Sequence, residues 1–213
     1  MKIIRTKFNK EGDMIYISHL DLQQLLQRAF RRAEIDLVHS QGFNPHPKIS
    51  YGNALALGTE SQGEYVDVEI VEDLSVEEYL KRMNEQLPKG IKFIKAKEID
   101  KQEASLASVI EYGEYIFTIE TEKALNKEYV KSKILKFMGQ DEIMITKKNK
   151  KGKIMESNIR PMIRNFDLLD IQENKLILEA TISTGSKVNL NTNIFIPKIL
   201  ELLELEMDPL DVD

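Results

Sequence analysis

The amino-acid sequence predicts an α+β fold made of two ferredoxin-like (βαββαβ-type) units, each an antiparallel sheet with helices on one face. Two observations predict it. Segments in which apolar and polar residues alternate, as in strands, are interspersed with segments whose apolar residues have helical spacing. Their order in residues 1–100 is strand, helix, strand, strand, helix, strand, and most of that order recurs in residues 112–213. We therefore expect two domains with these bounds.

The first domain should begin with strands at residues 2–9 and 14–17. Ser18 is a typical helix N-cap residue, with Asp21 at the capping-box position, and apolar residues at helical spacing continue to Ala33. The remaining elements that the pattern predicts are strands at 49–57 and 63–70, a helix at 74–88 and a strand at 91–99.

The second domain should follow a similar order. Residues 114–120 alternate as a strand does, and residues 126–139 have helical spacing that ends at a glycine. Further predicted elements are strands at 142–148 and 175–184 and a helix at 191–205, while the segment centred near residue 165 fits neither pattern clearly. A final strand is missing, unless the short tail supplies it.

The composition excludes several classes of protein. The chain has no apolar run of about 18 residues or more, so we expect no transmembrane helix. No secretory signal is visible, and the absence of cysteine excludes disulfides and thiolate metal sites, which fits a cytoplasmic protein. The net charge of −5 argues against a surface that coats nucleic acid over its whole extent. Residues 1–56 nevertheless carry eight Lys and Arg against five Asp and Glu, so a local basic face is possible.

All three histidines lie between residues 18 and 48, and one of them lies in the loop GFNPHP. Asn44 and His46 each precede a proline, which favours an extended backbone, and each proline fixes its own φ. The loop should therefore be stiff, and it could hold Phe43 outward for stacking with Asn44 and His46 for hydrogen bonding. The structural alternative is that Phe43 fills the core and Asn44 caps a turn.

Arg28, Arg31 and Arg32 should share one face of the first helix, because residues three and four apart are neighbours there. Clustered guanidinium groups suit phosphate or carboxylate ligands. The alternative is that they complement the helix dipole and pair with acidic residues of this chain, for which the candidates are Glu34, Asp36 and Glu64.

Two further basic segments follow. The run KKNKKGK, Lys147–Lys153, could be a phosphate-contacting arm or a solvated turn, and Asn158 and Arg160 lie beside Pro161 in a second proline-fixed segment. His19 or His46 could act as a general base. The histidine spacing matches no zinc pattern, so we expect no metal site.

The stretches SHLDLQQLLQRAFRRAEI and HSQGFNPHPKISYGNALALGTESQGEYVDVEI resemble the radical-SAM-associated family of uncharacterised bacterial proteins. The resemblance is densest over residues 3–70 and weaker at NIRP, residues 158–161. It implies a radical SAM protein as partner. The chain has no cysteine with which to hold an iron–sulfur cluster, so we expect no cofactor of its own.

These observations favour a binding module for structured RNA, such as tRNA or rRNA, that serves a radical SAM enzyme. The alternatives are an endoribonuclease or RNA-modifying enzyme that uses His46 or His19, and a protein–protein adaptor. We expect the arginine face and the proline loop to open into one shared hollow. The predicted substrate-binding residues are Arg28, Arg31, Arg32, Gln41, Phe43, Asn44, His46, Lys48, Asn158 and Arg160.

Overall fold

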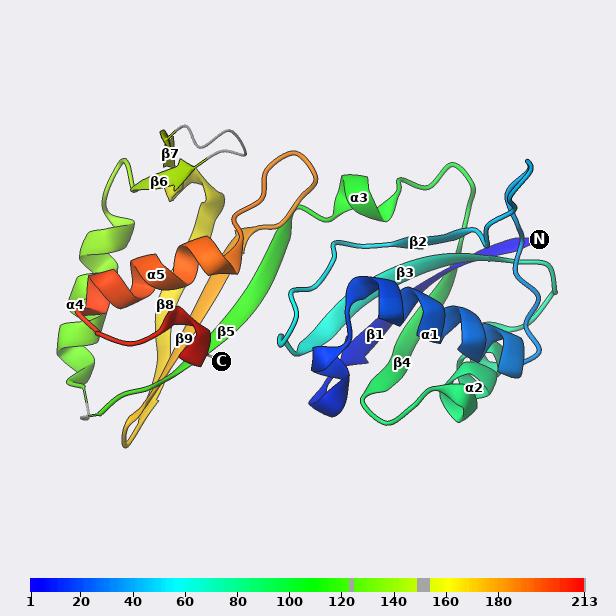
Figure 1. Cartoon of the computed structure of the whole chain (residues 1–213), viewed down its shortest axis with the longest axis horizontal. Coiled ribbons are helices and arrows are strands. Elements are labelled where there is room, and N and C mark those ends of the chain that lie inside the picture. Colours follow the sequence, from blue (N-terminus) through cyan, green and yellow to red (C-terminus); the bar gives the residue numbers. More distant parts are fainter. Residues whose placement is uncertain (123–124, 149–153, 213) are drawn as a thin grey trace. The chain divides into compact units, whose positions relative to one another are not determined.

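The structure is a computed structural model that describes residues 1–122, 125–148 and 154–212 (Figure 1). The chain divides into two compact units, Met1–Val109 and Ile110–Asp213. Both combine helices with antiparallel strands, so the predicted α+β class is confirmed. The connecting segment, which includes the short helix α3 (Leu106–Val109), lies almost entirely within unit 1.

Unit 1 contains a four-stranded antiparallel sheet with two helices on one face. The strand order is β2-β3-β1-β4. The strands are β1 (Lys2–Lys10), β2 (Ile49–Tyr51), β3 (Ser61–Ile70) and β4 (Ile91–Ile99), and the helices are α1 (His19–Arg32) and α2 (Val76–Gln86). The predicted order of elements is therefore present, but the strand expected at 14–17 is a 3₁₀ helix, η1 (Gly12–Tyr16). The strand expected at 49–57 ends at Tyr51, one residue before the glycine that interrupts its pattern.

Helix α1 begins and packs as its sequence predicts. The hydroxyl of Ser18 accepts a hydrogen bond from the amide of Asp21, and the Asp21 carboxylate accepts one from the amide of Ser18. The apolar stripe of the helix is buried against the sheet beneath it. The buried core of unit 1 comprises Ile4, Phe8, Leu22, Leu26, Ala29, Phe30, Ala33, Ile35, Val66, Val68, Ile70, Tyr79, Met83, Ile91 and Phe93.

Unit 2 contains a three-stranded antiparallel sheet of order β5-β9-β8 and a separate two-stranded sheet, β6-β7. The strands are β5 (Tyr112–Glu120), β6 (Met144–Lys148), β7 (Ile154–Asn158), β8 (Ile163–Gln172) and β9 (Lys175–Ser183). The helices are α4 (Lys127–Met138) and α5 (Thr192–Leu203), followed by the 3₁₀ helix η3 (Pro209–Asp211). Buried side chains of α4, α5 and the β5-β9-β8 sheet form one core.

This arrangement differs from the prediction for the second half, and a ferredoxin-like unit is not confirmed there. The segment that fitted neither pattern is strand β8, whose pairing with β9 shifts register between Ile163 and Asn165 and again between Leu168 and Asp170. Each irregularity interrupts the alternation of side chains, which explains why no strand was predicted there.

Gly90 tests the close backbone contact between the residues that follow β1 and those that precede β4. Its φ is +94°, and an added Cβ would lie 2.4 Å from the carbonyl oxygen of Glu11, whose amide donates to the Gly90 carbonyl oxygen. Gly58 also has positive φ, but open space surrounds its Cβ position. Both alanine substitutions should lower the free energy of unfolding by about 1 kcal/mol through backbone strain. We expect Gly90→Ala to lower it clearly more, as measured by urea unfolding, because its Cβ also meets the Glu11 carbonyl oxygen. Equal losses in the two variants would contradict this contact.

Candidate functional site

The proline loop is a braced projection, which we call the finger (residues 40–47). The amide of Ser40 donates to the carbonyl oxygen of His46 over 2.8 Å, and the amide of His46 donates to the Ser40 hydroxyl over 3.0 Å. An isolated β-bridge between His39 and Pro47 lies below them. Gly42 has a φ of +133°, which only glycine adopts without strain. The base of the finger is therefore fixed by hydrogen bonds and its tip by two prolines.

The tip of the finger is exposed to solvent. Phe43 is as exposed as a free side chain, with a relative accessibility of 113%. Gln41, Asn44 and His46 are exposed as well. The alternative that Phe43 fills the core is therefore wrong. At the base of the finger, the Nζ of Lys48 lies 3.0 Å from a carboxylate oxygen of Glu69, so its charge is already paired.

The arginines of α1 lie beside a groove of about 460 Å³ between α1 and the end of α2. Arg28 and Arg32 line it. Their guanidinium groups donate to the Gln24 side-chain oxygen over 3.0 Å and to the Gln86 carbonyl over 2.7 Å, respectively. Arg31 is exposed. Within the described ranges, none of the three forms an ion pair with a carboxylate, so their positive charge is available to a ligand.

The structure does not bring the finger and the groove into one hollow. The finger follows Leu37, which forms a β-bridge with Ile70. Ile70 pairs with Lys2, so the finger begins near the start of β1. The groove follows α1 from Ile17, just before the helix, to Arg32 at its last residue. No finger residue lines the groove. The finger and the groove are therefore separate features of unit 1.

Asn158 and Arg160 are occupied within unit 2. The guanidinium of Arg160 donates to the carbonyl oxygens of Met138 and Ile163 over 2.9–3.0 Å, and the Asn158 side-chain oxygen accepts from two backbone amides. These bonds join α4, β7 and β8, so both residues serve the fold. Of the basic run Lys147–Lys153, residues 149–153 lie outside the described part of the chain.

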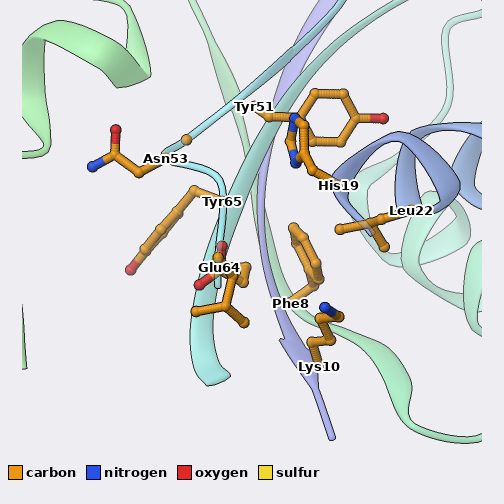
Figure 2. Close-up of a pocket in the computed structure, with 10 residues that line it drawn as sticks. Phe8, Lys10, His19, Leu22, Tyr51, Asn53, Glu64 and Tyr65 are labelled. Atoms are coloured by element: carbon orange, nitrogen blue, oxygen red, sulfur yellow. The ribbon is translucent and has the colours of Figure 1, made fainter. Parts of the chain in front are cut away.

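His19 does not reach the finger but lines a small polar cavity of about 10 Å³ in unit 1 (Figure 2). Its imidazole lies 2.8 Å from the Gln23 side-chain nitrogen and packs edge-on against the ring of Tyr51, with 5.2 Å between centroids. The full lining is Phe8, Lys10, His19, Leu22, Tyr51, Gly52, Asn53, Leu55, Glu64 and Tyr65. This volume holds about one water molecule. It is too small for a nucleotide.

Burial shifts the pKa of four groups that line this cavity. It lowers the pKa of His19, with a further contribution from the charge of Lys10, and it lowers the pKa of Lys10. Burial raises the pKa of the Tyr51 hydroxyl and of the Glu64 carboxyl, although the Ser61 hydroxyl and Lys10 partly oppose the shift of Glu64. Among the described residues, the Tyr51 hydroxyl oxygen is buried without a hydrogen-bond partner. A bound water is the ligand that suits it.

The sequence reasoning missed Lys10, Tyr51 and Glu64, although a signal for two of them is present. Lys10 continues the alternation of Ile4, Thr6 and Phe8, all buried, and Glu64 precedes Val66 and Val68 in the same phase of β3. A charged residue at an inward position of a strand indicates a buried polar contact. Lys10 makes one, since its Nζ donates to the Ile17 carbonyl over 3.0 Å.

The structure also bears on membrane crossing and metal binding. In the described parts of the chain, no helix combines the length and the apolar character that a membrane crossing needs. Across the same ranges, no three histidine, aspartate or glutamate side chains gather closely enough to hold a metal ion.

We predict that Glu64→Gln stabilises the protein at neutral pH. The raised pKa means that folding favours the protonated carboxyl, so this residue costs stability progressively as pH rises from its ordinary pKa through its folded one. Glutamine is neutral throughout. Its advantage in melting temperature should be present at pH 7 and vanish near pH 4. Glu85→Gln, at an exposed position of α2, is the control; a variant without any gain at pH 7 would disprove the burial argument.

One family of proteins matches most of the chain. Its description is an uncharacterised protein conserved in bacteria, DUF2344, and the match covers residues 3–192. No curated protein matches the chain. The match spans both units and confirms the expectation of an uncharacterised bacterial family, while the association with a radical SAM protein stays a prediction. The chain therefore belongs to the DUF2344 family of bacterial proteins.

Proposed function

We propose that this protein is an RNA-binding module that presents RNA to a radical SAM enzyme. The observation that carries the proposal is the finger, which holds one fully exposed aromatic ring on a braced base. An unpaired base can stack on Phe43, while Asn44 and His46 offer hydrogen bonds to its edges. Because the finger is preorganised, little conformational entropy is lost when it binds.

The separate places of the finger and the groove favour a polymer over a small metabolite, since no finger residue lines the groove. A single strand or loop of RNA can contact both, and it places a phosphate at each nucleotide, which suits Arg28, Arg31 and Arg32.

Charge limits how such an RNA would bind. The net charge of −5 opposes a nonspecific coat, so the contact has to be local and confined to the basic face of α1 and the finger. We exclude three predicted residues from the proposed ligand surface. Lys48 is paired with Glu69, and Asn158 and Arg160 form hydrogen bonds within the fold of unit 2. The surface that remains consists of Arg28, Arg31, Arg32, Gln41, Phe43, Asn44 and His46.

An adaptor role is the second candidate, because an exposed aromatic side chain also suits a pocket on a partner protein. Pull-down of the radical SAM enzyme with and without nuclease separates the two roles. Loss of the complex on nuclease treatment favours RNA as the bridge, and its survival favours direct contact. Catalysis by His19 has less support, because its cavity holds about one water.

Phe43→Ala should weaken binding of total tRNA in a filter-binding assay. Stacking of one base on an aromatic ring contributes about 1–3 kcal/mol, so the loss should be about 5- to 150-fold in affinity. Leu135→Ala is the matched control, since it removes an apolar side chain that is 76% exposed on α4 of unit 2. Equal affinities of the two variants would reject the finger as an RNA contact.

Arg31→Gln should lower the dependence of tRNA affinity on salt. Each neutralised phosphate contributes about −0.7 to −0.9 to the slope of log K against log salt concentration, so one lost contact should reduce the slope by about one. Lys101→Gln, at an exposed position outside the proposed surface, should leave it unchanged. An unaltered slope for Arg31→Gln would show that α1 does not contact phosphates.

A further inference from the structure

Strand β5 is an edge strand of the sheet in unit 2 (Figure 1). Its nine residues pair with β9 without any register shift. Among the described residues, no strand pairs with its other edge. A fully regular edge of this length is a template on which another strand can add.

The other three edges of the two larger sheets carry features that prevent such pairing. Strand β4 carries Lys92, Lys95 and Lys97. Strand β2 has only three residues, and the pairing of β8 is interrupted by two irregularities. Short edge strands, lysines and bulges all discourage association through an edge. Strand β5, with the sequence YGEYIFTIE, contains no lysine, proline or bulge.

The hydrogen bonds to β9 identify which residues of β5 face the open edge. The amide of Thr184 donates to the Glu111 carbonyl over 2.9 Å, and the amide of Thr121 donates to the Asn174 carbonyl over 2.7 Å. In an antiparallel pair the hydrogen-bonded positions alternate, so the odd-numbered residues bond to β9. The backbone groups that point to the open edge therefore belong to Tyr112, Glu114, Ile116, Thr118 and Glu120.

We propose that this edge pairs with β5 of a second copy of the chain, antiparallel and centred on Ile116. In this register Ile116 lies opposite its own copy, Glu114 opposite Thr118, and Tyr112 opposite Glu120. All five outward-facing residues are paired and no like charges meet. A shift by two residues in one direction places Glu114 opposite Glu120, and a shift in the other direction leaves Glu120 without a partner; both are less favourable.

This pairing also accounts for the exposed side chain at its centre. Ile116 is 55% exposed on the face of the sheet away from buried Phe117. Beside its own copy it would lose apolar surface to water, which is favourable. The two three-stranded sheets would join into one continuous sheet across a two-fold axis, the commonest symmetry of protein dimers.

The first test is the oligomeric state of the full chain by sedimentation equilibrium. The wild type should dimerise, and Ile116→Lys should weaken the dimer at least tenfold. The matched control is Leu169→Lys, which adds a lysine at a residue that is 54% exposed on the other edge strand, β8, and should leave the dimer intact. A monomeric wild type, or an Ile116→Lys variant that still dimerises as the wild type does, would overturn the proposal.

The second test fixes the register. Thr118→Glu places a glutamate opposite Glu114 of the other copy on each side of the two-fold axis and should weaken the dimer, while Glu114→Lys added to it should restore the dimer. Because the chain has no cysteine, Ile116→Cys should form an intermolecular disulfide on oxidation, since paired Cα atoms in this register lie about 5.5 Å apart. Failure of both the rescue and the cross-link would exclude this register.

Discussion

The packing of one helix on one sheet determines where every candidate functional residue of unit 1 lies. Leu26, Ala29 and Phe30 are fully buried between α1 and the strands beneath it. With this face fixed, the helix must direct its arginines to solvent, hold His19 over the polar cavity and deliver the chain to the base of the finger. The proposed binding surface is thus a consequence of core packing, and it persists only while that helix stays in register with the sheet.

The residues around the polar cavity also hold the start of α1 against the sheet. Burying an amino group is costly unless it is hydrogen-bonded, and Lys10, at the end of β1, meets the requirement through the carbonyl oxygens of Ile15 and Ile17. These carbonyls lie just before α1, so Lys10 links the end of β1 to the start of α1. Glu64 opposes this gain, because burial desolvates its carboxylate and raises its pKa despite the hydrogen bond from Ser61 and the charge of Lys10. We interpret the cluster as an anchor for α1 that retains a titratable carboxyl.

Local pattern sufficed for the elements that follow simple rules. Ser18 and Asp21 predicted the start of α1, and the two prolines predicted a stiff loop. It failed where long-range pairing and packing decide the outcome: the bulges of β8 hid a strand, and the finger does not line the groove beside α1. Arg160 shows a further limit, because only the fold reveals that its guanidinium is consumed by two backbone carbonyls.

If the proposed function is right, RNA contacts the exposed face of α1 and the finger together. Amide hydrogen exchange of the full chain, with and without bound tRNA, can show this, because it reports protection segment by segment. We expect slower exchange in residues 24–47 and unchanged exchange in β8 and β9. Protection confined to unit 2, or RNA binding that leaves the finger amides unprotected, would contradict it.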